Sequence, residues 1–255
     1  MVQIFCDPSL KNAEGTLLLE KEQFHHIVQV LRLREGECFG VTYRGETAQY
    51  RYTIEKIGAD GALCRLLDVK ETDVELPCRI TVLQGLPKAD KMETVITKSV
   101  ELGADRIVPV VCKRSVLKLE GKKADSRLQR WMKISESAAE QSHRAYVPEV
   151  SGLCGFKEAI QTAGSEAVRL IAYELAEEQG VTMEDTRRLI HGIRPGDRVE
   201  ILIGPEGGFT EEEVRQAAEA GFAPITLGRR ILRTETAAMT ILSWLVFHLE
   251  ARGKE

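Results

Sequence analysis

The sequence of 255 residues predicts an α/β protein with a small β-rich domain followed by a larger domain built on a mostly parallel sheet. Two observations predict this organisation. The first ~75 residues hold short runs of β-forming residues between Gly-containing turns, whereas the rest alternates between strand-like and helix-like runs. An acidic stretch that ends in proline, 71–77, separates the two patterns, so we place the domain boundary between residues 73 and 74.

The N-terminal region predicts strands at 38–43 and 49–54, where aromatic and β-branched residues recur. One short helix interrupts the strands, because the apolar residues Phe24, Ile27, Val28 and Leu31 recur at helical spacing. This set of elements is typical of a small β domain and is compatible with a barrel.

The C-terminal region predicts an alternation of strands and helices. We expect strands at 79–83, 106–111, 169–173, 199–203 and 225–227, and helices at 88–102, 125–142, 211–220 and 234–250. Alternation of this kind builds a parallel sheet that is covered by helices on both faces.

Composition excludes several classes of protein. Apolar residues make up 43% of the chain, yet the longest apolar run, 241–247, is far shorter than the ~20 residues that cross a bilayer. The six cysteines form no CxxC pair and no cluster with histidine, so we expect neither a metal site nor a disulfide framework. The first residues do not resemble a secretory signal, and we expect a cytoplasmic protein with no membrane partner.

Charge is concentrated in the middle of the chain. The formal net charge is -4 over residues 1–78, +6 over 79–144 and -6 over 145–255, counting Lys, Arg, Asp and Glu. A basic segment between acidic flanks predicts one face that attracts a polyanion. A solvated helical face rich in lysine is the alternative interpretation.

Residues 199–213, VEILIGPEGGFTEEE, place a glycine-rich turn directly after an apolar strand. Thr210 and Glu213 have the spacing of a capping box, which predicts that a helix follows. The turn therefore lies at the carboxyl end of a parallel strand, where open α/β sheets bind ligands. Glu206 disfavours phosphate there, so an adenosine, an amine or a positive sulfur suits the turn better than NAD or ATP. A tight turn that needs glycine only for its backbone is the structural alternative.

Residues 225–238, ITLGRRILRTETAA, repeat this arrangement. A short strand ends at a glycine, apolar and basic residues follow, and a helix begins near Thr234, a residue type suited to the N-cap. Two such crossings side by side form a pocket. The small side chains of Ala237 and Ala238 leave room for a ligand against the first turn of that helix.

In this order near the C-terminus, the two motifs resemble the signature of the SPOUT class of RNA methyltransferases. They are most similar to the RsmE family, the 16S ribosomal RNA (uracil1498-N3)-methyltransferases. Further motifs of this family match at 25–37 (HHIVQVLRLREGE), 88–93 (KADKME), 98–103 (KSVELG) and 139–148 (AEQSHRAYVP). The resemblance covers nearly the whole chain.

The resemblance implies a PUA-like β-barrel that binds RNA over residues 1–73 and a trefoil-knotted methyltransferase domain over residues 74–255. It also implies a homodimer with each active site near the subunit interface, and S-adenosylmethionine as the cofactor, without a metal. The residues to which it assigns cofactor binding are Leu202, Gly204, Pro205, Gly207, Gly208, Leu227, Gly228, Ile231, Leu232, Thr234 and Ala237.

The implied reaction is methylation of N3 of uridine 1498 in the 16S ribosomal RNA of the small subunit. The N3 proton must leave, and the negative charge that spreads onto O2 and O4 must be stabilised. Candidates to orient the base are Arg144, Arg233 and Gln141, and candidates to accept the proton are Glu206 and Glu235. A structural salt bridge is the alternative role for Arg144 and for Glu235.

Contacts with RNA phosphates are expected from the basic middle of the chain and from the N-terminal domain. The candidate residues are Lys88, Lys91, Lys113, Arg114, Arg32 and Arg34. Because aromatic residues are only 5% of the chain, base stacking on aromatic side chains is not expected to dominate.

Two other functions stay open at this point. One is an RNA-binding or ribosome assembly factor that has the same fold without catalysis, and the other is a SPOUT methyltransferase that acts on another nucleotide. A nicotinamide-dependent oxidoreductase is disfavoured because no GxGxxG follows the first strand of the second domain, and a serine hydrolase because GxSxG is absent.

Overall fold

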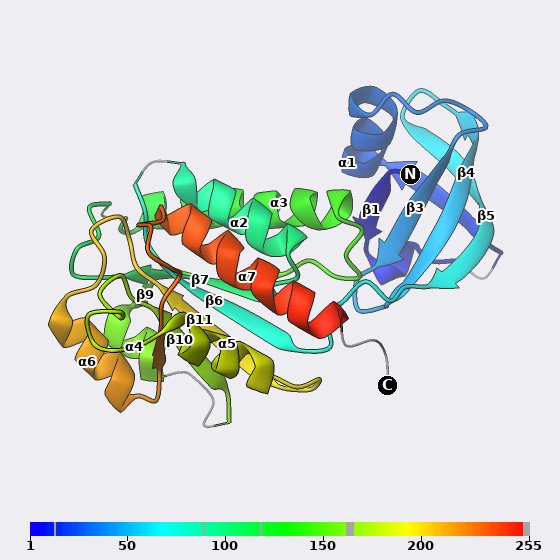
Figure 1. The fold of residues 1–255 in the computed structure, drawn as a ribbon. Coiled ribbons are helices and arrows are strands. Elements are labelled where there is room, and N and C mark those ends of the chain that lie inside the picture. Colours follow the sequence, from blue (N-terminus) through cyan, green and yellow to red (C-terminus); the bar gives the residue numbers. More distant parts are fainter. Residues whose placement is uncertain (13, 89, 118, 162–165, 252–255) are drawn as a thin grey trace. The chain divides into compact units, whose positions relative to one another are not determined.

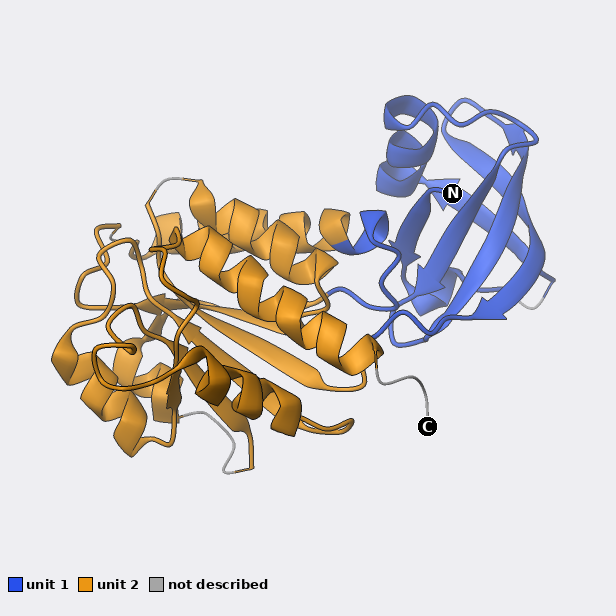
Figure 2. Ribbon diagram, in the orientation of Figure 1, with its two compact units in different colours: residues 1–75, 139–147 blue, residues 76–138, 148–255 orange. Residues whose placement is uncertain are grey.

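The computed structural model describes residues 1–12, 14–88, 90–117, 119–161 and 166–251 (Figure 1). The chain divides into two compact units, which Figure 2 shows in different colours. Unit 1 comprises Met1–Glu75 and Ala139–Val147, and unit 2 comprises Leu76–Ala138 and Pro148–Glu255.

Unit 1 is built on a five-stranded sheet in the order β1-β3-β4-β5-β2. Its strands are β1 (Gln3–Cys6), β2 (Thr16–Glu20), β3 (Cys38–Tyr43), β4 (Ala48–Ile57) and β5 (Gly61–Glu71). The strand predicted at 38–43 is confirmed, and the strand predicted at 49–54 lies within the longer β4. Two register shifts in the β4–β5 pair bend this ribbon, as β-bulges do.

The helical segment predicted around Phe24 and Ile27 is confirmed. A 3-10 turn, η1 (Pro8–Leu10), precedes β2, and α1 (Lys21–Phe24) then continues into a π-helical segment, η2 (His25–Val30). Both Phe24 and Ile27 are buried against the sheet, where they join a core that includes Phe39. Leu31, the last residue of the predicted pattern, lies one residue beyond η2 and is exposed, so the buried helical face is shorter than predicted.

Unit 2 is built on a seven-stranded parallel sheet in the order β12-β10-β11-β6-β7-β8, with β9 beside β7. Its strands are β6 (Arg79–Gly85), β7 (Arg106–Val111), β8 (Glu149–Val150), β9 (Cys154–Gly155), β10 (Val168–Ala172), β11 (Arg198–Ile203) and β12 (Ala223–Ile225). The predicted parallel sheet is confirmed. β12 lies two residues earlier than expected, and β8 and β9 are too short to show a pattern in the sequence.

Helices cover both faces of this sheet, as predicted (Figure 1). They are α2 (Lys91–Glu101), α3 (Lys122–Gln141), α4 (Phe156–Gln161), α5 (Met183–Gly192), α6 (Glu211–Glu219) and α7 (Thr234–Glu250). Ile201 and Ile203 pack with α2, α5 and α7, whereas Leu202 between them packs with α4 and α6. None of the helices in the described ranges combines the length and the apolar character that a membrane span requires.

Candidate active site

A cavity of about 350 Å³ opens in unit 2 where β10, β11 and β12 end. It lies at the carboxyl edge of the parallel sheet, the position at which open α/β sheets bind ligands. The residues that line it are Lys91, Ala172, Tyr173, Glu174, Glu177, Ile203, Gly204, Pro205, Glu206, Gly208, Phe209, Thr226, Leu227, Gly228, Arg229, Arg230, Ile231, Leu232, Arg233, Thr234 and Ala237.

The first glycine-rich turn, 204–209, packs its backbone directly against the end of β6. A Cβ atom added to Gly85 would lie 2.5 Å from the backbone nitrogen of Pro205, and one added to Gly204 would lie 3.3 Å from the Cα of Gly208. These glycines therefore allow a close approach of two backbone segments. The predicted capping box is confirmed, because the backbone N–H groups of Thr210 and Glu213 each donate to the other residue's side chain.

Glu206 is held in this turn by groups at the start of α2. The Nζ of Lys91 lies 3.0 Å from a carboxylate oxygen of Glu206, and the backbone N–H of Lys88 donates to the same carboxylate at 3.1 Å. Partial burial favours a higher pKa for Glu206, but hydrogen bonds from its own backbone N–H, from Lys91 and from Lys88 outweigh burial and leave the pKa lowered. Lys91 also lies 3.7 Å from Glu235, so it connects the first turn with α7.

Two buried threonine hydroxyls hold the ends of the second loop. At its start, the Oγ1 of Thr226 donates to Glu177 at 3.0 Å and accepts the backbone N–H of Gly228 at 3.1 Å. At its end, the Oγ1 of Thr234 donates to the carbonyl oxygen of Gly204 at 2.6 Å and accepts from the side-chain amide of Gln84 at 2.7 Å. Thr234 therefore ties together the ends of β6 and β11 and the start of α7.

The expectation that Thr234 caps α7 is wrong by one residue. The N-cap position is Arg233, whose side chain makes no capping hydrogen bond, and Thr234 is the first residue of the helix. The Thr234 hydroxyl is unavailable for capping because it bonds to Gly204 and Gln84 instead.

The cofactor-binding residues predicted from the sequence all line the cavity except Leu202 and Gly207. Leu202 is fully buried on the side of the sheet that α4 and α6 cover. The carbonyl oxygen of Gly207 accepts a hydrogen bond from Arg114 at 2.9 Å. Gly228 has a φ of +94°, which requires glycine, and the following loop exposes the side chain of Ile231.

The predicted catalytic residues fall in two places. Glu206 and Arg233 line the cavity. Glu235 is not among the lining residues, but it lies 3.7 Å from Lys91, which is one of them. Gln141 and Arg144 belong to unit 1 and are not among the residues that line the cavity. Gln141 is exposed at the last position of α3.

Arg144 is a buried residue with a structural ion pair. Its Nε donates to Glu75 at 2.8 Å, a terminal nitrogen lies 2.6 Å from the same carboxylate, and Glu75 also accepts the backbone N–H of Ala145. Burial favours a lower pKa for Arg144, but the hydrogen bond and charge of Glu75 outweigh burial and raise it. The carbonyl oxygen of Arg144 accepts from Gln3 of β1 at 2.8 Å. These bonds hold the segment 139–147 against the sheet of unit 1.

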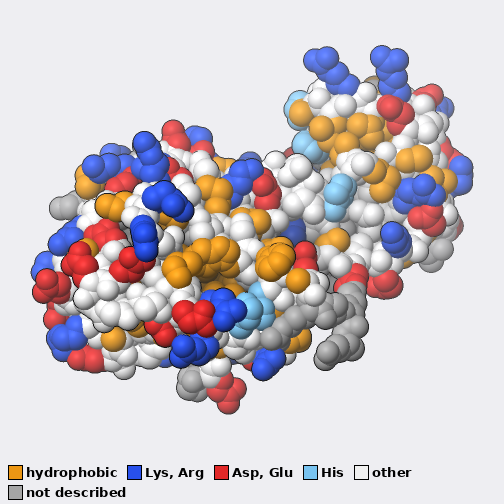
Figure 3. Space-filling view, viewed as in Figure 1, with side chains coloured by type: hydrophobic (Ala, Val, Ile, Leu, Met, Phe, Trp, Pro, Cys, Tyr) orange, Lys and Arg blue, Asp and Glu red, His pale blue; other side chains and the backbone are white. Residues whose placement is uncertain are grey.

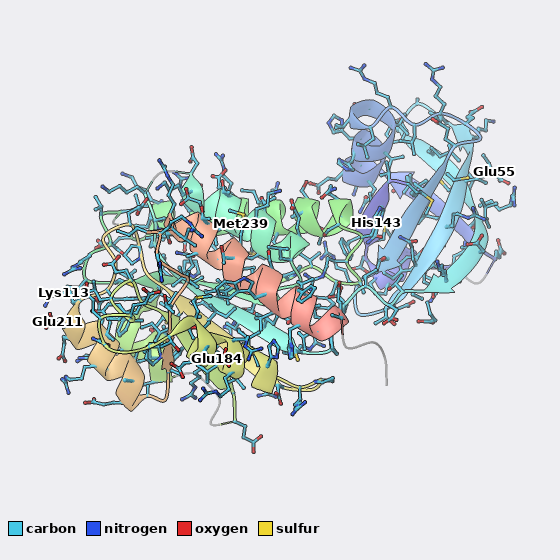
Figure 4. All side chains as sticks on the ribbon, in the orientation of Figure 1. Glu55, Lys113, His143, Glu184, Glu211 and Met239 are labelled. Carbon is cyan, nitrogen blue, oxygen red and sulfur yellow. The ribbon has the colours of Figure 1, made fainter. Side chains whose placement is uncertain are left out.

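The predicted RNA-binding cations differ in their exposure and in whether they already bond to other groups of this chain. Arg32, Arg34, Lys88 and Lys113 are exposed, whereas Lys91 pairs with the two glutamates. The exposed Arg114 donates to the carbonyl oxygens of Gly207 and Phe209. Lys113 and Glu211 are labelled in Figure 4 at the end of unit 2 where α6 begins, and the backbone N–H of Lys113 donates to Glu213 at 2.7 Å. Lys91 and Arg114 therefore stabilise the first turn.

Four residues that shape this site were not predicted from the sequence, namely Gln84, Gly85, Glu177 and Thr226. Gln84 carried a signal, because an amide in an otherwise apolar central strand needs a hydrogen-bond partner. Glu177 carried none, since its contact with Thr226 joins residues 49 positions apart.

In the described part of the chain, no group of three or more His, Cys, Asp and Glu side chains is placed to hold a metal ion. Burial raises the pKa of the thiols of Cys6, Cys64 and Cys112 to about 12, so these cysteines stay protonated and unreactive.

Comparison with known proteins defines the class of this fold and site. The family described as RNA methyltransferase domain matches residues 74–246, which contain the parallel sheet and the cavity. The family described as RNA methyltransferase PUA domain matches residues 19–67. The chain is an RNA methyltransferase.

Individual relatives identify the family within this class of enzymes. The ribosomal RNA small subunit methyltransferase E of Bacillus subtilis is 35% identical over 235 residues, which are 92% of this chain and 91% of that protein. The enzyme of the same name from Synechocystis is 31% identical over 93% of this chain and 75% of that one. A crystal structure of the Neisseria gonorrhoeae enzyme of this name, bound to S-adenosyl methionine, superimposes with a TM-score of 0.81 at 34% identity, covering 95% of each chain. This chain belongs to the family of ribosomal RNA small subunit methyltransferase E.

Proposed function

We propose that this chain transfers a methyl group from S-adenosylmethionine to N3 of a uridine in 16S ribosomal RNA, at position 1498, in the small subunit. The observation that carries the proposal is the cavity between two glycine-containing loops at the carboxyl edge of the parallel sheet. The similarity to a protein that binds S-adenosyl methionine supports the choice of cofactor.

The residues present in the cavity fit this cofactor. The volume of about 350 Å³ suits a ligand of nucleoside size. Gly204, Gly208 and Gly228 leave backbone groups accessible, and Glu174 and Glu177 place carboxylates where a cationic ligand gains from them. When bound, S-adenosylmethionine supplies a methyl group on a positively charged sulfur. The cofactor-binding residues named from the sequence stay part of the proposal. Ile231 takes part through its backbone, and Leu202 and Gly207, which do not line the cavity, act by holding the first turn in place.

The chain must also help a proton to leave uracil N3. Glu206 is a weak base, because its bonds to Lys91 and Lys88 lower its pKa. Glu235 is the other candidate acceptor: its Oε2 makes no hydrogen bond among the described residues and lies 3.7 Å from the Nζ of Lys91. Arg233 lines the cavity and forms no ion pair within the described ranges, so we assign it to orient the base and to stabilise charge on O2 and O4.

The finer features of the fold are part of the proposal. We assign residues 1–73 to a PUA-like barrel that binds RNA and residues 74–255 to a trefoil-knotted domain. The bond from Thr234 to Gly204 and the packing of Gly85 on Pro205 support interlocked loops. We further propose a homodimer with its active sites near the subunit interface, acting in the cytoplasm on the assembled subunit.

Transfer of label tests the proposed activity. The purified protein is incubated with radiolabelled S-adenosylmethionine and with small subunits from cells that lack the modification, and cofactor affinity is measured by calorimetry. We expect label in 16S ribosomal RNA and none in large subunits. Cofactor binding without any transfer would favour the non-catalytic RNA-binding function, and label in another RNA would point to a different substrate.

A further inference from the structure

The loop Leu227–Arg233, called the arginine loop below, has fixed ends and a projecting middle. The hydroxyls of Thr226 and Thr234 hold the two ends through the four hydrogen bonds described above. Both threonines are buried, whereas Arg229, Arg230 and Ile231 between them are not. A loop anchored in this way presents its central side chains in a defined position without burying them.

Ile231 is the most exposed large hydrophobic side chain of the described residues, at 89% of its surface. A single exposed apolar residue needs no functional explanation on an ordinary surface. Ile231, however, lies on a loop that lines the cofactor cavity, and in the sequence RRILR it stands between a pair of arginines and a third one. Its backbone can therefore border the cofactor while its side chain remains available to a second ligand.

The three arginines of the loop differ from most arginines of this protein. Arg229, Arg230 and Arg233 form no ion pair within the described ranges, whereas exposed arginines such as Arg187 and Arg215 pair with glutamates on their own helices. Figure 3 shows Lys and Arg side chains gathered over the part of unit 2 where α7 begins. The mouth of the cavity therefore offers guanidinium groups that form no ion pair with any described carboxylate of the chain.

We propose that the arginine loop holds the target nucleotide, with Ile231 packed against bases at the site and with Arg229 and Arg230 bound to the flanking phosphates. This inference rests on the proposed function. A base that is to react at N3 must leave its stack and its pairing, and apolar side chains inserted between bases stabilise such unstacked states. Arginine binds phosphate oxygens through charge-assisted hydrogen bonds.

The observations favour RNA over a second copy of this chain as the partner of the arginine loop. Around a two-fold axis, the same patch of each copy contacts its counterpart. Such a contact centred on this loop would bring two sets of unpaired arginines together, and like charges repel. A polyanion satisfies the arginines and covers Ile231 at the same time.

Replacement of Ile231 tests its part in the inference. We compare Ile231→Ala and Ile231→Leu with Met132→Ala, which truncates another exposed apolar side chain, on α3. For Ile231→Ala we expect cofactor affinity within about twofold of the wild type and kcat/KM for small subunits about tenfold lower, since burial of an aliphatic side chain against a partner is worth about that much. Ile231→Leu should restore most of the activity, and Met132→Ala should match the wild type.

Replacement of arginines tests the phosphate contacts. The double variant Arg229→Gln/Arg230→Gln is compared with Arg187→Gln/Arg188→Gln, which removes two exposed arginines from α5. Each phosphate contact contributes about one to the slope of log Kd for the small subunit against log salt. The loop variant should therefore lower this slope by about two, and the α5 variant should leave it unchanged.

Three results would overturn the inference. If Ile231→Ala weakened cofactor affinity as much as kcat/KM, the side chain of Ile231 would bind the cofactor rather than the RNA. If it changed the sedimentation of the protein, the loop would be an interface between copies. If subunit affinity and its salt slope stayed at wild-type values in the loop variants, the loop would not touch RNA. Failure of the proposed function can be told apart from failure of this inference. In that case the wild type would bind subunits without methylating them, and the subunit affinities of the variants would still decide whether the loop binds RNA.

Discussion

At the scale of single residues, the threonine hydroxyls at the cavity act mainly by positioning backbone. Thr234 was predicted to cap a helix and to bind the cofactor, yet its hydroxyl joins Gln84 to Gly204. The sequence indicated that this residue matters because a Thr stands at a helix start after a glycine loop. The sequence could not show that Gln84 is the partner, because Gln84 lies 150 positions away and a local sequence pattern gives no information on contacts between distant residues.

Thr234→Val should weaken cofactor binding about tenfold. The change keeps the shape of the side chain but leaves the buried groups of Gln84 and Gly204 without their partner, at a cost of about 1–3 kcal/mol. Thr234→Ser keeps the hydroxyl and should bind nearly as well as the wild type. Calorimetric titration with S-adenosylmethionine measures both. Equal affinities for the Val and Ser variants would show that the hydroxyl does not position the site.

Gly204→Val should abolish cofactor binding while the fold survives. A Cβ at this position already lies 3.3 Å from Gly208 and from the ring of Phe209, so the larger side chain must displace the first turn or fill the cavity. Thermal unfolding and calorimetry separate the two effects. Unchanged affinity in the folded variant would remove Gly204 from the cofactor site.

The ion pair of Glu206 predicts a defined pH dependence. Because the pKa of Glu206 in the folded chain is lowered below its ordinary value of 4.5, the pair stabilises the fold above that pH, and the contribution is lost as the pH falls through the lowered pKa. Glu206→Gln should therefore melt below the wild type at neutral pH and approach it in acid. Thermal unfolding of both proteins from about pH 3 to about pH 7 measures the difference, because this range extends from neutral pH to below the ordinary pKa of a glutamate. A difference that did not change with pH would contradict this role of the charge.

At the scale of elements, capping signals and glycine-ended strands located most of unit 2. The box of Thr210 and Glu213 was recognised and is confirmed. An equivalent box at Thr182 and Asp185 starts α5, which the sequence analysis did not predict although the signal was present. The strands β8 and β9 gave no signal, because two residues are too few for a period. They exist because a neighbouring strand, β7, offers backbone partners.

The segment that follows α3 is held in unit 1 by the ion pair of the buried Arg144 with the partly buried Glu75. Arg144→Ala would leave the partly buried carboxylate of Glu75 without its cation, so it should lower the free energy of unfolding by about 3 kcal/mol. Cofactor affinity should change little, because neither residue lines the cavity. Denaturant titration and calorimetry test both statements. Wild-type stability with lost methyl transfer would instead support the catalytic role that the sequence suggested for Arg144.

At the scale of the whole molecule, the sequence predicted two regions of different architecture, and the structure has a mixed sheet in unit 1 and a parallel sheet in unit 2. Alternation of strands and helices predicted the second of these, because buried parallel strands must be joined by crossovers. Features that depend on a second chain leave no such pattern. The proposed dimer predicts a sedimenting mass of twice 28.5 kDa at micromolar concentration, and a monomer that still methylates subunits would contradict it.

The central claim is that the cavity between the two loops methylates uridine N3 in 16S ribosomal RNA. Small subunits that lack the modification are incubated with the protein and S-adenosylmethionine, and their RNA is digested and analysed by mass spectrometry of nucleosides and of sequence-specific fragments. We predict one N3-methyluridine per subunit, within the fragment that contains position 1498, and none with Gly204→Val. Methylation of another nucleotide or atom by the wild type, or undiminished methylation by Gly204→Val, would contradict the claim.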